Sequence, residues 1–204
     1  MEKTQLLKQA VAKAMDYSAY RQLIDELLEA GKTTGPKQSE ELTGYTKLNV
    51  QRMNRLDKTV KILPEITMAL EALNQPLTWL IITEGWCGDA AQIVPVLQKL
   101  TDATPNIDLK LVLRDENPDL MDLYLTNGSK SIPKLIVLDE DYREIAVWGP
   151  RPQSIQEVIT DAKSRGIDMK EVIEKAHLAY ARDKTRSTQL EMLQLLDQLH
   201  LVLV

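Results

Sequence analysis

The sequence has little of the chemistry on which many enzymes depend, since its 204 residues include one cysteine and two histidines. A single cysteine excludes a disulfide framework within the chain and any cysteine-rich metal site. The two histidines, His177 and His200, are too few for the usual histidine-based zinc or iron centres. We therefore predict no metal site.

A basic stripe and a long apolar run are also missing. The 25 Lys and Arg residues stand against 30 Asp and Glu, a net charge of −5, so neither nucleic acid nor an anionic membrane is expected as a main partner. No apolar run approaches the ~18 residues that span a bilayer, and the N-terminus begins an amphipathic pattern rather than a signal peptide. We predict a cytoplasmic protein, in which a lone thiol stays reduced unless it has a redox task.

The period of the apolar residues changes twice along the chain. Helical spacing fills the first third, strand-like patterns begin at Leu77, and helical spacing returns after Ile167. The expected elements of the middle part are strands 77–83, 107–113, 134–138 and 143–148, and helices 88–103, 117–126 and 153–164. This order predicts an α/β domain over residues 76–166, with a mixed four-stranded sheet and helices on both faces. Residues 1–75 and 167–204 are expected to be helical extensions, the second packed on the domain.

Three further features are interpreted as structural. The run Arg114-Asp115-Glu116 is expected to be a solvated turn, and His177 is expected to cap or pack a helix. The chain ends in Leu-Val-Leu-Val, residues 201–204, which is exposed apolar material unless it docks. We therefore expect packing or a homodimer surface there.

The string Trp86-Cys87-Gly88-Asp89-Ala90 lies between the first strand and the first helix of the α/β part. Here the sequence resembles the thioredoxin-like superfamily, whose signature at this junction is Trp-Cys-Gly-Pro-Cys, with a proline eight residues after the first cysteine. Pro95 stands at that spacing, and Ile132-Pro133 stands where the family places a cis-proline beside the active cysteine. The resemblance covers residues 77–165. It implies a thioredoxin-like fold, Cys87 as the nucleophile and a cis Pro133 as the docking edge.

Elementary electrostatics bears on the same cysteine. A cysteine at a helix N-terminus faces unpaired N–H groups and the positive end of the helix dipole, which favour the thiolate. Two acids, Glu84 and Asp89, flank Cys87 and oppose its ionisation, so its pKa is expected to be less depressed than the helix end alone would make it. Asp89 is also a candidate to pass a proton to a leaving thiol, or it serves the helix dipole alone.

The sequence departs from the family pattern at three positions. Ala90 stands in place of the resolving cysteine, so no second sulfur of the same chain can release a mixed disulfide from Cys87. Ile81 and Leu111 replace the buried aspartate and lysine that handle protons in thioredoxin. Thioredoxin-type dithiol turnover is therefore excluded for a monomer.

A last candidate is the loop after the final strand, Trp148-Gly149-Pro150-Arg151-Pro152. In the related glutaredoxins this loop helps to hold glutathione, so Arg151 is expected either to pair with a carboxylate of a small thiol or to be a solvated surface residue. The predicted substrate-binding residues are Trp86, Gly88, Ile132 and Arg151.

The leading hypothesis is a monothiol thioredoxin-like oxidoreductase in which Cys87 exchanges with a low-molecular-weight thiol or a client protein disulfide. Cys87, Asp89 and Pro133 are its catalytic candidates. No cofactor is predicted beyond an external thiol, such as glutathione or bacillithiol, that resolves the adduct. Two other hypotheses stay open, a redox-inactive binding module and a peroxide sensor whose sulfenic acid waits for an external thiol.

Overall fold

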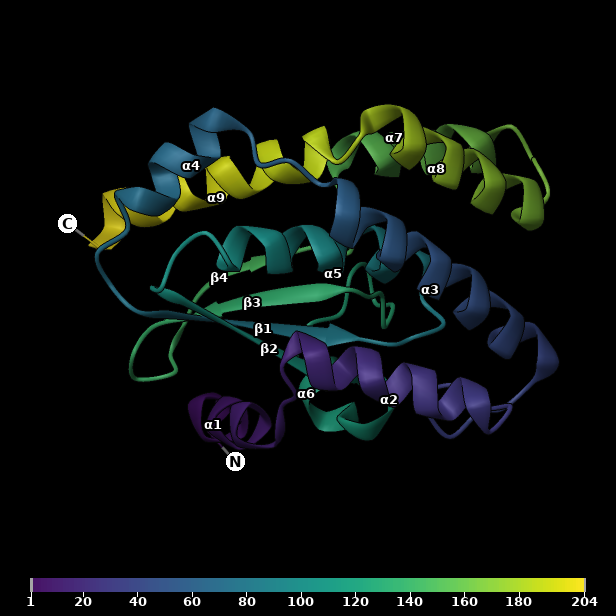
Figure 1. Cartoon of the computed structure of the whole chain (residues 1–204), viewed down its shortest axis with the longest axis horizontal. Helices are drawn as coiled ribbons and strands as arrows, with labels where there is room; N and C mark the ends of the chain where they lie inside the picture. The colour runs from purple at the N-terminus through teal and green to yellow at the C-terminus, as the bar shows by residue number, and fades with distance from the viewer. Residues whose placement is uncertain (1, 204) are drawn as a thin grey trace.

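A mixed four-stranded sheet forms the centre of the computed structural model, which describes residues 2–203, with side chains up to residue 199 (Figure 1). The strands are β1 (Leu77–Thr83), β2 (Ile107–Leu113), β3 (Lys134–Leu138) and β4 (Glu144–Trp148). Their order is β2-β1-β3-β4, with β1 parallel to β2 and antiparallel to β3. The predicted α/β class with a mixed sheet is confirmed.

The central strand β1 is apolar on both faces because helices cover both sides of the sheet. Side chains of a strand alternate between the two faces, so Trp79 and Ile81 join one core cluster while Leu80 and Ile82 join the other. All four side chains are fully buried. A continuous apolar run without polar alternation is what such a doubly covered strand needs.

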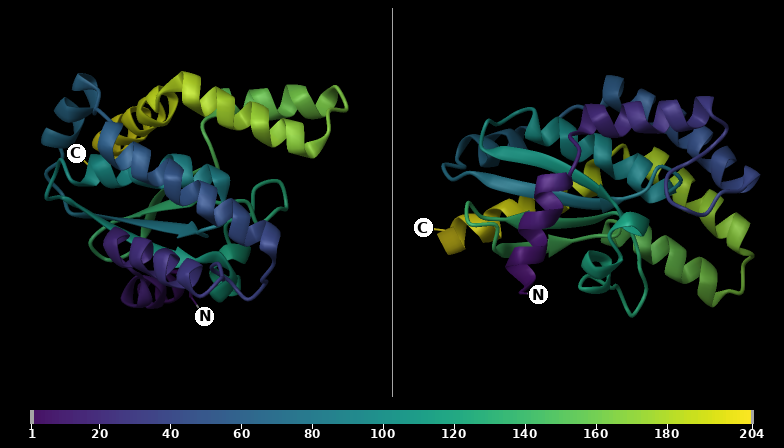
Figure 2. Two further views of the ribbon diagram at one scale, coloured as in Figure 1. Left: turned by 45° about the vertical axis from the view of Figure 1, so that its right-hand side comes forward. Right: turned by 90° about the horizontal axis from the view of Figure 1, so that it is seen from below.

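Two sets of helices form these layers (Figures 1 and 2). The larger layer holds α2 (Tyr17–Glu29), α3 (Glu40–Thr59), α4 (Pro64–Glu71), α5 (Gly88–Thr101), α7 (Gln153–Ser164), α8 (Met169–Asp183) and α9 (Arg186–Leu203). The opposite face is covered by α1 (Lys3–Lys13) and α6 (Pro118–Asp122). Figure 2 shows α7 and α8 as a pair that extends away from the sheet. The division into a domain and two extensions stays a prediction; α2, α3, α4, α8 and α9 share one hydrophobic core with the sheet, and α1 packs in the core on the opposite face.

Two local expectations differ from the structure. The helix expected over 117–126 ends at Asp122. Asn127 and Gly128, expected to stop this helix, instead adopt positive φ in a separate tight turn in which Thr126 and Ser129 exchange backbone hydrogen bonds. The first helical segment is divided at Met15, whose N–H and C=O pair with Leu111 on β2 at 2.9 and 2.8 Å. This bridge covers part of the free edge of β2.

Two other expectations concern the ends of the chain and the membrane. The proposed packing or dimer role of residues 201–204 lies outside the side chains that the structure describes. Over the described residues, no helix combines the length and apolar character needed to cross a bilayer.

Candidate functional site

Cys87 is the N-cap of α5, directly after the turn that leaves β1. Its Sγ accepts a hydrogen bond from the N–H of Ala90 at 3.5 Å and donates one to the carbonyl of Ile132 at 3.3 Å. The Ile132–Pro133 peptide bond is cis. The structure therefore brings Cys87 to the loop that precedes β3, as the resemblance implied.

The loop after β4 lies against the same proline. Gly149 has a φ of +112°, and a Cβ built on it would lie 2.5 Å from the carbonyl oxygen of Pro133. The Gly149–Pro150 peptide bond is also cis. Only a residue without a side chain allows this close approach, so Gly149 fixes the distance between the two proline loops.

The thiol of Cys87 is harder to ionise than an ordinary cysteine. Burial is the largest cause and the charge of Asp89 the second, and together they raise the pKa of Cys87 from 9.0 to about 12. The N–H groups of Ala90 and Asp89 and the guanidinium of Arg151 lower the pKa by less. The residue faces a cavity and is only partly buried, yet the loss of hydration outweighs the helix terminus. The expected opposition by Asp89 is confirmed in direction, whereas the lowering expected from the helix end is outweighed by burial, which the sequence analysis did not weigh.

Asp89 is held by residues from two distant parts of the chain. Its Oδ2 accepts hydrogen bonds from Nε and Nη2 of Arg151 at 3.1 and 2.7 Å, and its Oδ1 accepts one from the hydroxyl of Tyr180 at 2.7 Å. Arg151 also donates to Gln156 at 2.7 Å. The guanidinium is therefore not a solvated surface group, and it pairs with Asp89 rather than standing ready for a ligand's carboxylate. Both oxygens of Asp89 are therefore engaged, and its role in passing a proton to a leaving thiol stays a prediction.

Glu84 does not flank the thiol in the expected way. Its side chain is fully buried, and its carboxyl group accepts hydrogen bonds from the hydroxyl of Thr34 and from the N–H of Asp115, the latter at 2.9 Å. Burial raises the pKa of Glu84 above its usual value. This acid ties the loop before α3 to the end of β2, so only Asp89 of the two predicted acids acts on Cys87.

The run expected to be a solvated turn instead packs beside the site. Residues Arg114–Glu116 form a short 3-10 helix. The guanidinium of Arg114 lies 4.6 Å from the ring centroid of Trp86, in a cation–π contact. Arg114 thereby holds Trp86, a predicted substrate-binding residue, next to Cys87.

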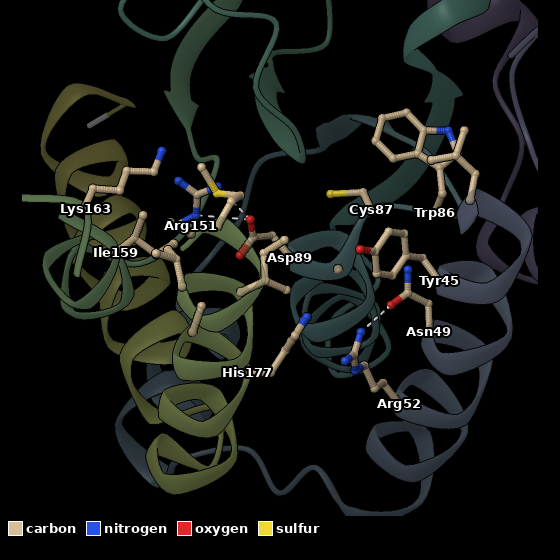
Figure 3. A pocket seen from close by; sticks show the side chains of 16 residues that line it. Tyr45, Asn49, Arg52, Trp86, Cys87, Asp89, Arg151, Ile159, Lys163 and His177 are labelled. Atoms are coloured by element: carbon tan, nitrogen blue, oxygen red, sulfur yellow. Dashed lines mark hydrogen bonds and ion pairs between the residues drawn. The ribbon is translucent and has the colours of Figure 1, made fainter. Parts of the chain in front are cut away.

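A cavity of about 380 Å³ opens beside the thiol, between α3 and α8 (Figure 3). Its lining combines the residues around Cys87 with side chains from both helices and from α7: Leu42, Tyr45, Asn49, Arg52, Trp86, Cys87, Gly88, Asp89, Arg151, Ile159, Lys163, Met169, Val172, Ile173, Ala176 and His177. This volume lies within the range of small-molecule sites, roughly 300–1,000 Å³. Ile132 and Pro133 are not among the lining residues.

His177 was expected to cap or pack a helix; it packs against the start of α5 and is also a wall of the cavity. Its ring lies so close to Gly88 that a Cβ on the glycine would be 2.8 Å from both Cε1 and Nε2. Burial and the nearby Arg52 lower the pKa of His177 to about 4, so the ring is neutral near pH 7. In the sequence, the spacing of Ala176, His177 and Tyr180 is that of residues that pack on one face of a helix. This spacing does not indicate that a cavity lies beside α8.

Helix α3 supplies the other side of the site, which sequence analysis also missed. The buried Asn49 donates from Nδ2 to the carbonyl of Gly85 at 2.9 Å, fixing the backbone two residues before Cys87. Its Oδ1 accepts a hydrogen bond from Nη1 of Arg52 at 2.7 Å. Asn49 therefore links the turn after β1 to an arginine that faces the cavity.

An alanine at position 88 is expected to destabilise the fold by about 1–2 kcal/mol, because its Cβ would displace the packed ring of His177. Urea denaturation measures the loss. Gly44→Ala in α3 is the control, since a Cβ there meets nothing within 4 Å, and it is expected to be neutral or stabilising. Adding His177→Ala to Gly88→Ala should recover part of the loss. Equal losses at positions 88 and 44 would contradict the close contact.

The described residues contain no group of three or more His, Cys, Asp or Glu side chains placed to hold a metal ion. The chemistry that the site offers is that of one thiol beside a small cavity.

Comparisons with known proteins agree with the fold. A sequence model of the family described as Thioredoxin matches residues 35–163, more than half of the chain. A relative named putative thioredoxin 2, from Streptomyces coelicolor, is 33% identical over 89 residues, which are 43% of this chain and 62% of the relative. The chain thus spans less than two thirds of that relative's length.

Two solved structures resemble this chain in fold. One is a protein of unknown function from Pseudomonas aeruginosa, with a TM-score of 0.53 and 16% identity, and the other is an HIV epitope scaffold, with a TM-score of 0.52 and 18% identity. Each match covers 89% of this chain and 96% of the other chain. At this coverage the matches extend well beyond residues 76–166.

Proposed function

Because this chain belongs to the thioredoxin family, we propose that it is a monothiol thiol–disulfide oxidoreductase in which Cys87 exchanges with a low-molecular-weight thiol. One observation carries the proposal. Cys87 caps α5 beside the Ile132–Pro133 loop and faces a small cavity, in a sequence that has no second cysteine. The proposal suits a compartment rich in small thiols, such as the cytoplasm.

The exchange has two steps, and atoms and electrons balance in each. The thiolate of Cys87 attacks one sulfur of a small disulfide RSSR, forming Cys87–S–S–R, and the released RS⁻ takes up the proton that the thiol lost. An external thiol R′SH then attacks the sulfur of R, which gives RSSR′ and restores the Cys87 thiol. The disulfide is reduced in the first step and the external thiol is oxidised in the second.

The raised pKa of Cys87 makes both steps of this exchange slow and prolongs the lifetime of the mixed disulfide. Near neutral pH the thiol is almost wholly protonated, so attack by Cys87 is slow. A thiolate of high pKa is also a poor leaving group, so the external thiol releases Cys87 slowly. With Ala90 in place of a resolving cysteine, the mixed disulfide is the long-lived state of the proposed cycle.

The walls of the cavity favour a small substrate over a client protein. Side chains of α3 and α8 stand on opposite sides of Cys87, among them Tyr45 and His177 (Figure 3). A thiol that lines a cavity of about 380 Å³ is more accessible to a small disulfide than to a folded protein.

A binding module without redox chemistry is the second candidate, and the pKa of about 12 at Cys87 favours it. In that case the S–H group is a structural donor to the carbonyl of Ile132. The two candidates differ in whether the folded chain forms a disulfide at all.

Intact-mass spectrometry after incubation with glutathione disulfide separates them. We expect one glutathione per folded chain, formed faster at higher pH and removed by excess reduced thiol, and none on Cys87→Ser. The matched control is the unfolded chain in urea, whose thiol is fully accessible. Reaction of the unfolded chain without any reaction of the folded chain would support the binding module.

A further inference from the structure

Arg52 on α3 is a cation without an acidic partner. Its Nη1 donates to the neutral amide oxygen of Asn49 at 2.7 Å, and among the described residues it forms no ion pair. Burial and the neighbouring Arg55 lower the pKa of Arg52. The same Nη1 lies 3.7 Å from the place of a Cβ on Gly88, so the guanidinium is held beside the residue that follows Cys87.

The cavity around Arg52 has an excess of positive charge. Its charged lining residues are Arg52, Asp89, Arg151 and Lys163. The ion pair of Asp89 with Arg151, at 2.7 Å, uses the only acid of this lining. Arg52 and the exposed Lys163 therefore stay uncompensated, in a chain whose net charge is −5. Such a local reversal of sign attracts an anion.

The opposite wall of the cavity is apolar. Ile159 of α7 and the α8 side chains Met169, Val172, Ile173 and Ala176 line this side. Met169 is 54% exposed, which is high for an apolar side chain on the rim of a cavity. An occupant that covers this wall and also meets Arg52 has an apolar part and an anionic end.

We infer that the cavity selects small thiols and disulfides that carry a carboxylate, with Arg52 as the group that binds this carboxylate. The identity of the reacting sulfur rests on the proposed function, whereas the binding of the anion does not. A guanidinium held by Asn49 presents its remaining N–H groups in a fixed fork that matches a carboxylate. Arg151, which the sequence suggested for this role, is already paired with Asp89.

Two chromogenic disulfides test the inference on the full chain. 5,5′-Dithiobis(2-nitrobenzoate) carries a carboxylate on each ring, and 2,2′-dithiodipyridine is neutral. Arg52→Gln is expected to slow the second-order reaction of Cys87 with the anionic reagent about tenfold or more, the usual size of a lost charged hydrogen bond. The rate with the neutral reagent should stay within about twofold.

Arg55→Gln is the matched control, because it removes the same charge from the exposed side of the same helix. We expect it to change neither rate by more than about twofold. If Arg52→Gln and Arg55→Gln slow the anionic reagent equally, the effect comes from the overall charge of the protein. If Arg52→Gln slows both reagents equally, the substitution has changed the reactivity of the Cys87 thiol itself. Either result would overturn the inference.

A binding measurement separates failure of this inference from failure of the proposed function. S-Methyl 5-thio-2-nitrobenzoate keeps the anionic ring but cannot exchange, and its binding to Cys87→Ser is followed by tryptophan fluorescence. We expect the additional change Arg52→Gln to weaken binding about tenfold or more. If the folded wild type reacts with neither disulfide but this ligand binds in a way that depends on Arg52, the proposed thiol–disulfide exchange is wrong and the anion-binding role of Arg52 is supported. If binding is absent or does not depend on Arg52, the anion site is wrong.

Discussion

Iodoacetamide is expected to alkylate Cys87 in the folded protein a hundred- to a thousandfold more slowly than in the unfolded chain at about pH 8. Alkylation consumes the thiolate, and the pKa of Cys87 is raised from 9.0 to about 12 by burial and by Asp89. The folded protein therefore keeps its thiol proton over a pH range in which the unfolded chain loses it. Between about pH 9 and 11 the rate should go on rising about tenfold per pH unit for the folded chain and level off for the unfolded chain.

Asp89→Asn tests the electrostatic part of this shift. Removing the carboxylate removes the second-largest cause of the raised pKa and frees Arg151, whose charge lowers it. The alkylation rate should therefore rise, by about three- to tenfold at a fixed pH. A proton-donor role for Asp89 in thiol release would not produce this gain. Equal rates for the folded and unfolded wild type would contradict the raised pKa of Cys87.

Ala90→Cys is expected to convert a chain without dithiol turnover into one that forms an internal disulfide. The N–H of Ala90 lies 3.5 Å from Sγ of Cys87, so the first turn of α5 brings position 90 next to the thiol. The wild type should not reduce insulin with thioredoxin reductase as the electron source, and the variant should do so slowly. Ile81 and Leu111, both fully buried, offer no group to carry protons in that step.

Ala91→Cys is the matched control for this gain. It adds the same thiol to a neighbouring buried position of α5 but not at the spacing of the family motif. We expect a mass loss of two hydrogens after oxidation of the position-90 variant and none for the position-91 variant. Insulin reduction by the wild type would mean that a cysteine of a second subunit acts as the resolver.

The sheet was predictable because its sequence signals are local. The uninterrupted apolar run of β1 has the pattern of a strand buried on both faces. The Cys87, Pro95 and Pro133 spacings then indicated one fold among several α/β alternatives. The helix expected over 117–126 was too long because Asn127 and Gly128 were interpreted as its stop signal, whereas they form a separate turn between Thr126 and Ser129.

The surroundings of the thiol were less predictable because they depend on contacts distant in sequence. Asp89 meets Arg151 and Tyr180 across 62 and 91 positions, and nothing in their local sequence pairs them. Glu84 stands close to Cys87 in the sequence, but its carboxyl group is hydrogen-bonded to Thr34, 50 positions earlier. The α3 and α8 side chains that line the cavity have the spacing of ordinary core residues.

The sign of the pKa shift at Cys87 depends on the same distant packing. A helix N-terminus favours a thiolate, and the hydrogen bond from Ala90 expresses this effect. Burial outweighs it, and the groups around the sulfur, the carbonyl of Ile132 and the cavity lining from α3 and α8, come from distant parts of the sequence. An isolated motif cannot reveal that balance.

The state of Cys87 inside cells tests the proposed exchange most directly. Cells are lysed under conditions that block free thiols, and the Cys87 peptide is analysed by mass spectrometry without reduction. We expect a fraction of the peptide to carry one small thiol as a mixed disulfide, with that fraction rising after mild disulfide stress and falling on recovery. A Cys87 peptide that stays entirely as the free thiol before and during such stress would contradict the exchange.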